Sequence, residues 1–548
     1  MFWMAGRGDK LGTGKRAAPD GGGRSAARRL RCTAALAGLL FISGFAAAAE
    51  LSPTRVLREK CGACHIEGGK LQRLADMRKT PEGWDMAIAR MQVWHKIKVS
   101  KAERRVLVKH LADRYGLAPE EAAPYRFLIE RVPNSQDLAP SEELAQMCGR
   151  CHSFGRVALQ RRDKAEWLQL IHTHLGQFPS IEYSALGRDR NWWDIAREKT
   201  AGELAALYPR QTAAWKNWQA RKAQSAAGTW RVAGHRPGWG DYTGYLFVEP
   251  LGKDRYTTRY DLQYAAGNRV VGEGESVVYT GYEWRGDASI GNEATRSVFA
   301  IDGDRLSGRW FLRNADEIGA SLRAVRVVPG SAPTVLAVSP ALLKAGSTQR
   351  LRISGVKLSA APDLGPGVKT LDVLRRSNDE IELLVSVDVQ APDGVRQVLA
   401  PGGKAGQALA IYRQIDSVRV EPAFGIARLG GGTNAPVSAQ FAAVAWLNGP
   451  DGQPGTADDV RLGTLPASWR VDNYDERARA EDDVKFAGHI EPHGQFIPAS
   501  AGPNPARHNM TNTGDLKVIA SVLDGERKID SEAHLMVTVQ RWNTPPLR

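Results

Sequence analysis

Cys61-Gly-Ala-Cys-His65 and Cys148-Gly-Arg-Cys-His152 are two copies of one pentapeptide, Cys-x-x-Cys-His, that begin 87 residues apart. This pentapeptide is the attachment motif of a c-type haem. Its two thiols add to the two vinyl groups of one haem, and the following histidine supplies an axial nitrogen to the iron. The two copies therefore predict a dihaem cytochrome c domain. The predicted haem attachment residues are Cys61, Cys64, Cys148 and Cys151, and the predicted proximal ligands are His65 and His152.

The cysteine count agrees with haem attachment. The chain has five cysteines, of which Cys32 falls in a predicted leader and the other four form the two motifs. A zinc site made of four thiolates would not require a histidine directly after each pair. A dithiol redox motif would account for one pair but not for two. Haem attachment is the interpretation that uses every residue of both motifs.

Residues 1–49 are predicted to be a signal peptide. Four arginines precede an apolar stretch from Cys32 to Phe45, and four alanines before Glu50 resemble a cleavage site. The apolar stretch is shorter than the roughly 20 residues that a membrane-spanning helix needs. Because haem is attached to such motifs outside the inner membrane, the leader and the motifs together predict a periplasmic protein without a membrane span.

The formal charge of +14 overstates the charge of the mature chain. Residues 1–49 carry eight Lys/Arg and two Asp/Glu, which leaves 66 positive and 58 negative side chains, or about +8. This excess is scattered rather than clustered, so nucleic-acid binding is not predicted. With about 500 mature residues, the chain should form several domains.

The fold class predicted is multidomain, α plus all-β. A helical dihaem domain is expected over 50–225, where Ser100-Lys-Ala-Glu103 forms a capping box and opens a helix with Val106, Leu107, His110 and Leu111 on one face. Short strands broken by Gly and Pro then predict three antiparallel barrel or sandwich domains. These are a barrel-like domain over 226–331, an immunoglobulin-like sandwich over 332–415 and a C-terminal sandwich over 416–548. In the second of these, alternation is expected at Leu351, Ile353, Leu371, Val373, Ile381 and Leu383.

An internal repeat predicts the sixth ligands of the two irons. Trp84 is followed seven residues later by Met91, and Trp167 is followed seven residues later by His174. Both segments are expected to be helices, so Met91 is predicted to complete the first haem site and His174 the second. Met raises a haem potential relative to His, which would set a gradient between the haems. Competing candidates are Met77, Met86 and His95 for the first iron and His172 for the second.

One acidic loop is a weaker candidate site. Asp451, Asp458 and Asp459 lie in a Gly-rich segment that resembles a calcium loop without the EF-hand spacing. A solvated hairpin loop is the simpler interpretation. Nothing in the β domains combines a nucleophile, a base and an orienting acid, so no catalytic residue is predicted on this chain, which is expected to carry electrons.

The order of these parts resembles the α subunit of quinohaemoprotein amine dehydrogenase over nearly the whole mature chain. The stretches that carry the resemblance are Lys60–His65 with Thr80–Trp84, Met147–His152 with Gly176–Tyr183, and Gly308–Phe311. The resemblance implies a periplasmic heterotrimer with two covalently bound haems c on this chain. A β-propeller subunit and a small subunit bearing a cysteine tryptophylquinone would complete it.

The resemblance also implies an activity. Primary amines reduce the quinone on the small subunit and leave as aldehyde and ammonia, and the haems of this chain pass the electrons to a soluble blue copper protein or cytochrome c. Two alternatives are a dihaem subunit of another periplasmic dehydrogenase and a non-enzymatic binding protein that senses redox state. A gene for a short Cys-rich chain beside this one would argue against the first alternative.

Overall fold

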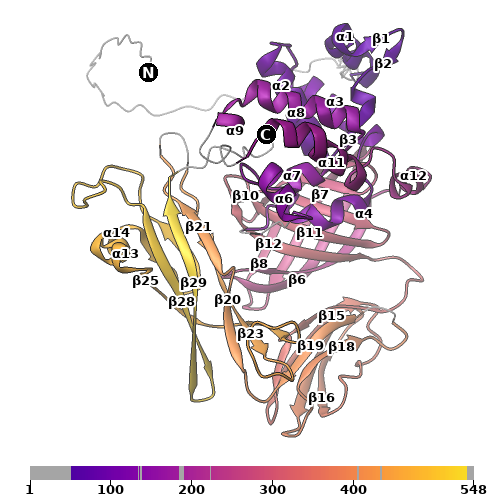
Figure 1. Cartoon of the computed structure of the whole chain (residues 1–548). Coiled ribbons are helices and arrows are strands. Elements are labelled where there is room, and N and C mark those ends of the chain that lie inside the picture. The colour runs from indigo at the N-terminus through magenta and orange to yellow at the C-terminus, as the bar shows by residue number, and fades with distance from the viewer. Residues whose placement is uncertain are drawn as a thin grey trace, which may run out of the picture. The chain divides into compact units, whose positions relative to one another are not determined.

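The structure, a computed structural model, describes residues 51–539 apart from 134, 136–138, 184–189, 222–223, 404–405 and 432–434. The predicted leader, with Cys32, lies outside the described residues. A helical part comes first and three β-rich parts follow, which confirms the predicted fold class (Figure 1). No helix within the described ranges is both long and apolar enough to cross a bilayer.

The helical part consists of short helices and two very short strand pairs, β1-β2 and β3-β4. Its main helices are α1 (Pro53–His65), α2 (Pro81–Trp94), α3 (Lys101–Arg114), α4 (Pro119–Ala122), α5 (Arg126–Ile129), α6 (Glu142–Leu144), α7 (Gly155–Ala158), α8 (Lys164–Gln177), α9 (Ser180–Tyr183), α10 (Trp192–Ile195), α11 (Ala201–Leu207) and α12 (Ala213–Gln219). The remaining elements are η1 (Leu74–Asp76), η2 (Ala123–Tyr125), η3 (Ala145–Gly149), η4 (Ala196–Thr200), β1 (Ile66–Glu67), β2 (Lys70–Leu71), β3 (Met77–Lys79) and β4 (Gln160–Arg162).

The predicted capping box of α3 is present. The Glu103 amide donates to the Ser100 hydroxyl at 3.2 Å, and the Ser100 amide donates to the Glu103 carboxylate at 2.8 Å. These bonds satisfy backbone donors that have no partner within the helix. The buried face of α3 differs slightly from the prediction, because Val106 and His110 are only half-buried. The fully buried residues of this face are Leu107, Val108, Leu111 and Ala112.

The internal repeat extends further than the tryptophan segments. Lys79 in β3 donates its amide to the Tyr115 carbonyl at 2.9 Å, and Arg162 in β4 donates its amide to the Tyr208 carbonyl at 3.2 Å. Both tyrosines directly follow a helix, α3 in the first repeat and α11 in the second. Each repeat therefore contains a strand, a tryptophan helix and a closing helix in the same order.

The two repeats meet at an antiparallel ladder between β3 and β4, in which Arg78 lies opposite Arg161. Both guanidinium groups bind Glu121 of α4. Arg78 makes two parallel bonds of 2.7 Å to the Glu121 carboxylate, and Arg161 donates to the same carboxylate at 3.2 Å. All three side chains are buried. One carboxylate therefore joins both repeats to the segment that connects them.

The first β part is a closed up-and-down barrel in which each strand pairs with its neighbours in sequence and β12 pairs with β5. Its strands are β5 (Gly228–Arg236), β6 (Gly240–Gly252), β7 (Arg255–Tyr264), β8 (Arg269–Tyr279), β9 (Glu283–Ile290), β10 (Glu293–Asp302), β11 (Arg305–Leu312) and β12 (Ala315–Arg326). Eight strands leave an interior that side chains can fill. Large aromatic residues fill it here, among them Trp230, Tyr242, Tyr260, Trp284, Phe299 and Trp310.

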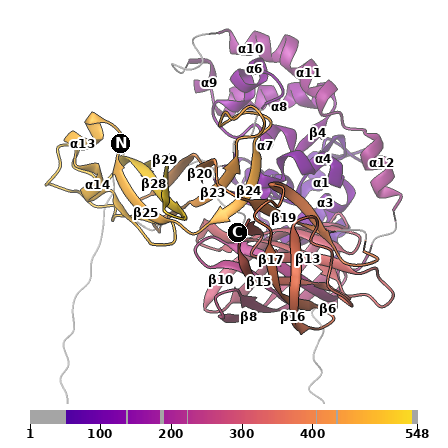
Figure 2. The ribbon, with the colours of Figure 1, turned by 90° about the horizontal axis from the view of Figure 1, so that it is seen from below.

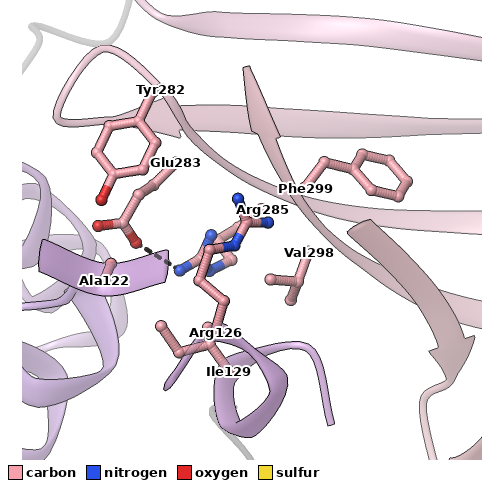
Figure 3. Close-up of a pocket in the computed structure, with 8 residues that line it drawn as sticks. All are labelled: Ala122, Arg126, Ile129, Tyr282, Glu283, Arg285, Val298 and Phe299. Atoms are coloured by element: carbon pink, nitrogen blue, oxygen red, sulfur yellow. Dashed lines mark hydrogen bonds and ion pairs between the residues drawn. The ribbon is translucent and has the colours of Figure 1, made fainter. Parts of the chain in front are cut away.

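The helical part contacts the barrel through a buried charge network. Arg285 of β9 donates to Glu82 of α2 at 2.6 Å and to Glu283 at 2.6 Å. Burial opposes the charged form of both carboxyls, but Arg285 outweighs burial at Glu82 and lowers its pKa, whereas burial raises the pKa of Glu283 to about 7. Figure 3 shows Arg285 beside Arg126 and Ile129 of the helical part. These residues line a cavity of about 10 Å³.

The end of α3 also rests on the barrel. Thr280, between β8 and β9, donates its hydroxyl to the Ala112 carbonyl at 3.1 Å and its amide to Asp113 at 2.8 Å. A Cβ atom at position 116 would lie 2.7 Å from the Thr280 hydroxyl, so only glycine fits at Gly116. These contacts fix the first repeat against the barrel wall.

The next β part is a sandwich of two sheets, β13-β15-β17-β16 and β14-β19-β18. Its strands are β13 (Thr334–Ser339), β14 (Leu342–Lys344), β15 (Thr348–Val356), β16 (Val368–Arg376), β17 (Glu380–Val387), β18 (Gly394–Leu399) and β19 (Gly406–Tyr412). The predicted alternation is right for Leu351, Ile353, Ile381 and Leu383, which are core residues. It is wrong for Leu371 and Val373, because β16 is an edge strand on which both side chains are exposed.

The C-terminal β part contains the sheets β20-β23-β24, β21-β29-β28-β25 and β22-β27-β26. Its strands are β20 (Ser417–Glu421), β21 (Phe424–Arg428), β22 (Ala439–Gln440), β23 (Ala442–Leu447), β24 (Val460–Leu465), β25 (Ser468–Asn473), β26 (Gly488–Ile490), β27 (Gln495–Pro498), β28 (Gly514–Asp524) and β29 (Arg527–Thr538). Two features differ from the all-antiparallel expectation. The β14–β19 and β21–β29 pairs are parallel. Short helices α13 (Glu476–Ala480) and α14 (Asp483–Phe486) follow β25 (Figure 2).

We predict that Glu121→Gln lowers the free energy of unfolding of the helical part by about 3–5 kcal/mol, because it leaves two buried arginines without a counter-charge. The pKa of Glu121 is lowered from its usual value of 4.5 by Arg78, despite burial. This stabilisation is therefore complete at neutral pH and is lost as the carboxyl protonates at lower pH. Thermal unfolding followed by haem absorbance measures it. The neighbouring exposed Glu120→Gln should change the midpoint little, and an equal change in both variants would contradict the prediction.

Candidate functional site

The first Cys-x-x-Cys-His motif occupies the last turn of α1. Cys61 and Cys64, three residues apart on the helix, share one side, and both are free thiols. The Nδ1 atom of His65 is buried without a hydrogen-bond partner. Burial, followed by the nearby Arg73, lowers the pKa of His65, which favours the neutral imidazole that binds metals. The thiols and the histidine fit one covalently attached haem.

The second motif has the same sequence pattern but a different backbone. Cys148 lies in η3, a π-helical turn, and Cys151 and His152 follow in a bend rather than in a helix. The Cys148 thiol is half-buried, and burial raises its pKa to about 12. The Nδ1 atom of His152 is bonded to the Ser153 carbonyl at 2.9 Å. This bond orients the ring so that Nε2 is the atom available to an iron.

The second repeat brings His174 close to His152. His174 lies on α8 at the same face as Trp167 and Ile171, which are buried at positions seven and three residues before it. Its Nδ1 atom is bonded to the Leu170 carbonyl at 2.9 Å. Burial lowers the pKa of His174, and the proximity of His152 lowers it further. The competing His172 is exposed and packs edge-on against Trp193, with ring centroids 4.8 Å apart.

The first repeat offers two candidates for the sixth ligand. Met91 is half-buried on the face of α2 that contains Trp84 and Ile88. His95 caps the end of α2 and is exposed, but it lies near enough to His65 to lower the pKa of that residue.

The other two methionines are less suited to be the sixth ligand of the first iron. Met77 is a buried core residue of β3, and the residue at its place in the second repeat is Gln160. Met86 lies only two residues after Trp84, so it points to a different side of α2. Met91 stays the predicted sixth ligand of the first iron, with His95 as its competitor.

Sequence reasoning missed a set of basic side chains around these histidines. Lys79 and Arg162 are buried, Arg90 and Arg156 are half-buried, and Arg73 is exposed. The sequence contained a signal for these basic residues, because the internal repeat extends to positions before Trp84 and Trp167. Arg73 and Lys79 in the first repeat have the same spacing from Trp84 as Arg156 and Arg162 have from Trp167.

The acidic loop does not assemble into a metal site. Asp458 accepts a bond from the Thr456 hydroxyl at 2.6 Å, and Asp459 forms an ion pair with Arg419. No group of three or more His, Cys, Asp or Glu side chains suited to a metal ion occurs within the described ranges. The side chains of this loop are thus engaged with one another and with Arg419.

The duplicated helical part with two Cys-x-x-Cys-His motifs, the closed barrel and the two sandwiches define a multidomain haem-binding protein. Residues 52–215 match the family described as quinohemoprotein amine dehydrogenase A, alpha subunit, haem binding. Residues 223–327, 332–413 and 418–547 match domains II, III and IV of the same alpha subunit. The chain therefore belongs to the α-subunit family of quinohemoprotein amine dehydrogenase, a multi-subunit amine oxidoreductase.

Three of the solved structures that match parts of the chain have low sequence identity to it and low TM-scores. The redesigned β barrel mFAP1, bound to DFHBI, is 17% identical over 20% of this chain and 99% of its own, with a TM-score of 0.17. Mouse clustered PcdhgC3 EC1-3 is 12% identical over 45% of this chain and 77% of its own, with a TM-score of 0.15. Bacteroides ovatus SGBP-B, in complex with a mixed-linkage heptasaccharide, is 11% identical over 57% and 64%, with a TM-score of 0.19. No curated protein matches the chain.

We predict that His174→Ala converts one haem from a six-coordinate to a five-coordinate spectrum and leaves the other unchanged, because it removes a half-buried histidine that lies close to His152. Absorption and resonance Raman spectra of the oxidised protein measure this change. The control is His172→Ala, which removes an exposed histidine two residues away and should leave both haems low-spin. The opposite pattern would assign the ligand to His172.

For the first haem, we predict that Met91→Ala abolishes the weak sulfur-to-iron absorption band of the oxidised protein and lowers the potential of that haem, because thioether ligation raises the potential. His95→Ala should preserve the band. Persistence of the band in Met91→Ala would assign the ligand to Met86 or Met77. Absence of the band from the unsubstituted protein, with a spectral change in His95→Ala, would assign it to His95.

Proposed function

We propose that this chain is the dihaem electron-transfer subunit of a periplasmic quinohaemoprotein amine dehydrogenase. In this proposal it receives electrons from a cysteine tryptophylquinone on another subunit, after oxidative deamination of a primary amine to aldehyde and ammonia. It passes them to a soluble blue copper protein or cytochrome c. The observation that carries the proposal is the pair of Cys-x-x-Cys-His motifs on a chain of this family, with His174 close to His152 of the second motif.

A bound haem supplies a one-electron couple whose potential depends on its axial ligands and on nearby charge. The residues of this chain hold and tune that couple. Cys61, Cys64, Cys148 and Cys151 would attach the two haems, and His65 and His152 would be the proximal ligands. Met91 and His174 differ in kind, so the two sites are expected to differ in potential and to favour transfer in one direction.

The contact between the repeats supports transfer inside the chain. The ladder of β3 and β4 and the Glu121 carboxylate hold the two motif regions in one rigid unit. Rigid placement lowers the reorganisation that each transfer requires. The Arg285 network then ties this unit to the barrel.

An exposed sheet edge supports assembly with partner subunits. The edge strand β16 exposes Leu371, Val373 and Leu374. An exposed apolar edge strand is a surface that proteins normally cover. In the proposed heterotrimer, a β-propeller subunit and the small quinone-bearing subunit are the available partners.

We predict that a primary amine reduces the haems of the complex purified anaerobically from its native host. Stopped-flow absorption of the reduced haem bands measures the reaction. A carbonyl reagent such as phenylhydrazine should block reduction by the amine but not by dithionite, because it traps the quinone. Replacing Cys148 and Cys151 by Ala should halve the amplitude. Reduction by dithionite alone, with the small subunit confirmed present, would favour another periplasmic dehydrogenase.

A further inference from the structure

A group of like charges lies between the two repeats with few counter-charges. It comprises Arg73, Lys79, Arg90, Arg156 and Arg162, together with the carboxylates of the buried Glu166 and the exposed Asp163. Lys79 and Arg162 are only 6% and 4% exposed. We call these five residues the basic cluster. Its members come from both repeats, and two pairs of them occupy equivalent repeat positions.

The hydrogen bonds of the basic cluster leave most of its charge uncompensated. Glu166 accepts from Arg162 at 3.2 Å and from Arg73 at 3.4 Å. Lys79 and the Nε atom of Arg162 donate only to the neutral Gln160 side chain, at 2.8 and 3.0 Å. Within the described ranges, no ion pair is formed by Lys79, Arg90 or Arg156. The neighbouring Arg78 and Arg161 differ, because both bind Glu121.

The charges of the basic cluster repel one another. Burial lowers the pKa of Lys79 well below its usual range, and Arg162 and Arg90 lower it further. Burial also lowers the pKa of Arg162 to about 10. The pKa of Arg90 falls through burial and the nearby Arg156. Buried charges are retained when a partner of opposite charge is present, so this arrangement calls for an anionic ligand.

The basic cluster lies beside both candidate haem sites. Gln72, next to Arg73, donates its amide to the His65 carbonyl at 2.7 Å. Arg90 directly precedes Met91 on α2, and Arg156 lies on α7, four residues after His152. A haem carries two propionates on one edge, and two haems therefore bring four negative charges. Five cations against Glu166 and Asp163 leave an excess of three positive charges. The sign and the location of this charge correspond to haem propionates.

We propose that Lys79, Arg90, Arg156 and Arg162 bind the propionates of the two haems, so that the propionate edges of both haems meet at the β3–β4 ladder. This inference rests on the proposed function, because it presumes two attached haems. It adds a role for residues outside the attachment motifs. By offsetting the negative charge of the propionates, these cations would raise the potential of both haems, since positive charge disfavours the oxidised iron.

The test compares Lys79→Gln and Arg162→Gln with Lys164→Gln in the full chain, purified with its native partners. Lys164 is exposed and lies two residues from Arg162, so its variant is the control for loss of one charge. Haem content is measured first by the pyridine haemochrome. The propionate bending bands in resonance Raman spectra and the two midpoint potentials are then measured.

We expect each cluster variant to shift propionate bands and to move at least one midpoint potential to a more negative value, with Lys164→Gln matching the unsubstituted protein. Lowered potentials with unshifted propionate bands would overturn the proposal, because the cations would then act only at a distance. Bands and potentials equal to those of Lys164→Gln would overturn it as well. Absence of haem from the unsubstituted chain would instead overturn the proposed function.

Loss of haem from the Gln variants would be resolved with charge-conserving variants. Both variants keep the positive charge but change the shape of the donor group. Arg162→Lys replaces a planar guanidinium by a compact ammonium group, and Lys79→Arg does the opposite. We expect these variants to keep two haems and near-normal potentials and to shift propionate bands. Unshifted bands in both would overturn direct binding.

Discussion

The Glu121 carboxylate, shared by Arg78 and Arg161, is the interaction on which the helical part depends. The two arginines lie opposite each other in the β3–β4 ladder, so without a common anion their charges would repel at the junction of the repeats. Because all three groups are buried, loss of the carboxylate would leave a charge that water cannot reach. The same contact holds the two motif regions at a fixed separation, as an internal electron path requires.

The next residue of each strand, Lys79 in β3 and Arg162 in β4, is a buried cation without such a matched counter-charge. Lys79 and Arg162 are as buried as Arg78 and Arg161 but share one neutral amide and one carboxylate with their neighbours. A protein chain tolerates such an imbalance where a bound anion completes the site. Within one ladder, therefore, Arg78 and Arg161 form a structural contact with Glu121, whereas Lys79 and Arg162 are placed to bind an anionic ligand.

Several elements follow directly from local sequence. The capping box at Ser100 predicts the start of α3, and the spacing of Trp84 and Trp167 predicts the helices that hold Met91 and His174. The burial of strand residues was harder to predict, because it depends on which strands and sheets pack beside them. Leu371 alternates like a core residue but is exposed, because β16 has a partner on one side only. The short helices α13 and α14 carry no strong periodic signal, so sequence reasoning missed them.

Covalent chemistry and local geometry were thus accessible from the chain, because a Cys-x-x-Cys-His motif or a cap involves residues within a few positions of one another. Tertiary packing decided what distant residues share. It placed Cys148 on a π-helical turn although Cys61 lies on an α-helix, and it brought His174 beside His152. It also gathered Lys79 and Arg162 into one buried cluster. Burial and electrostatic repulsion depend on distances across the fold, and residue order alone does not specify those distances.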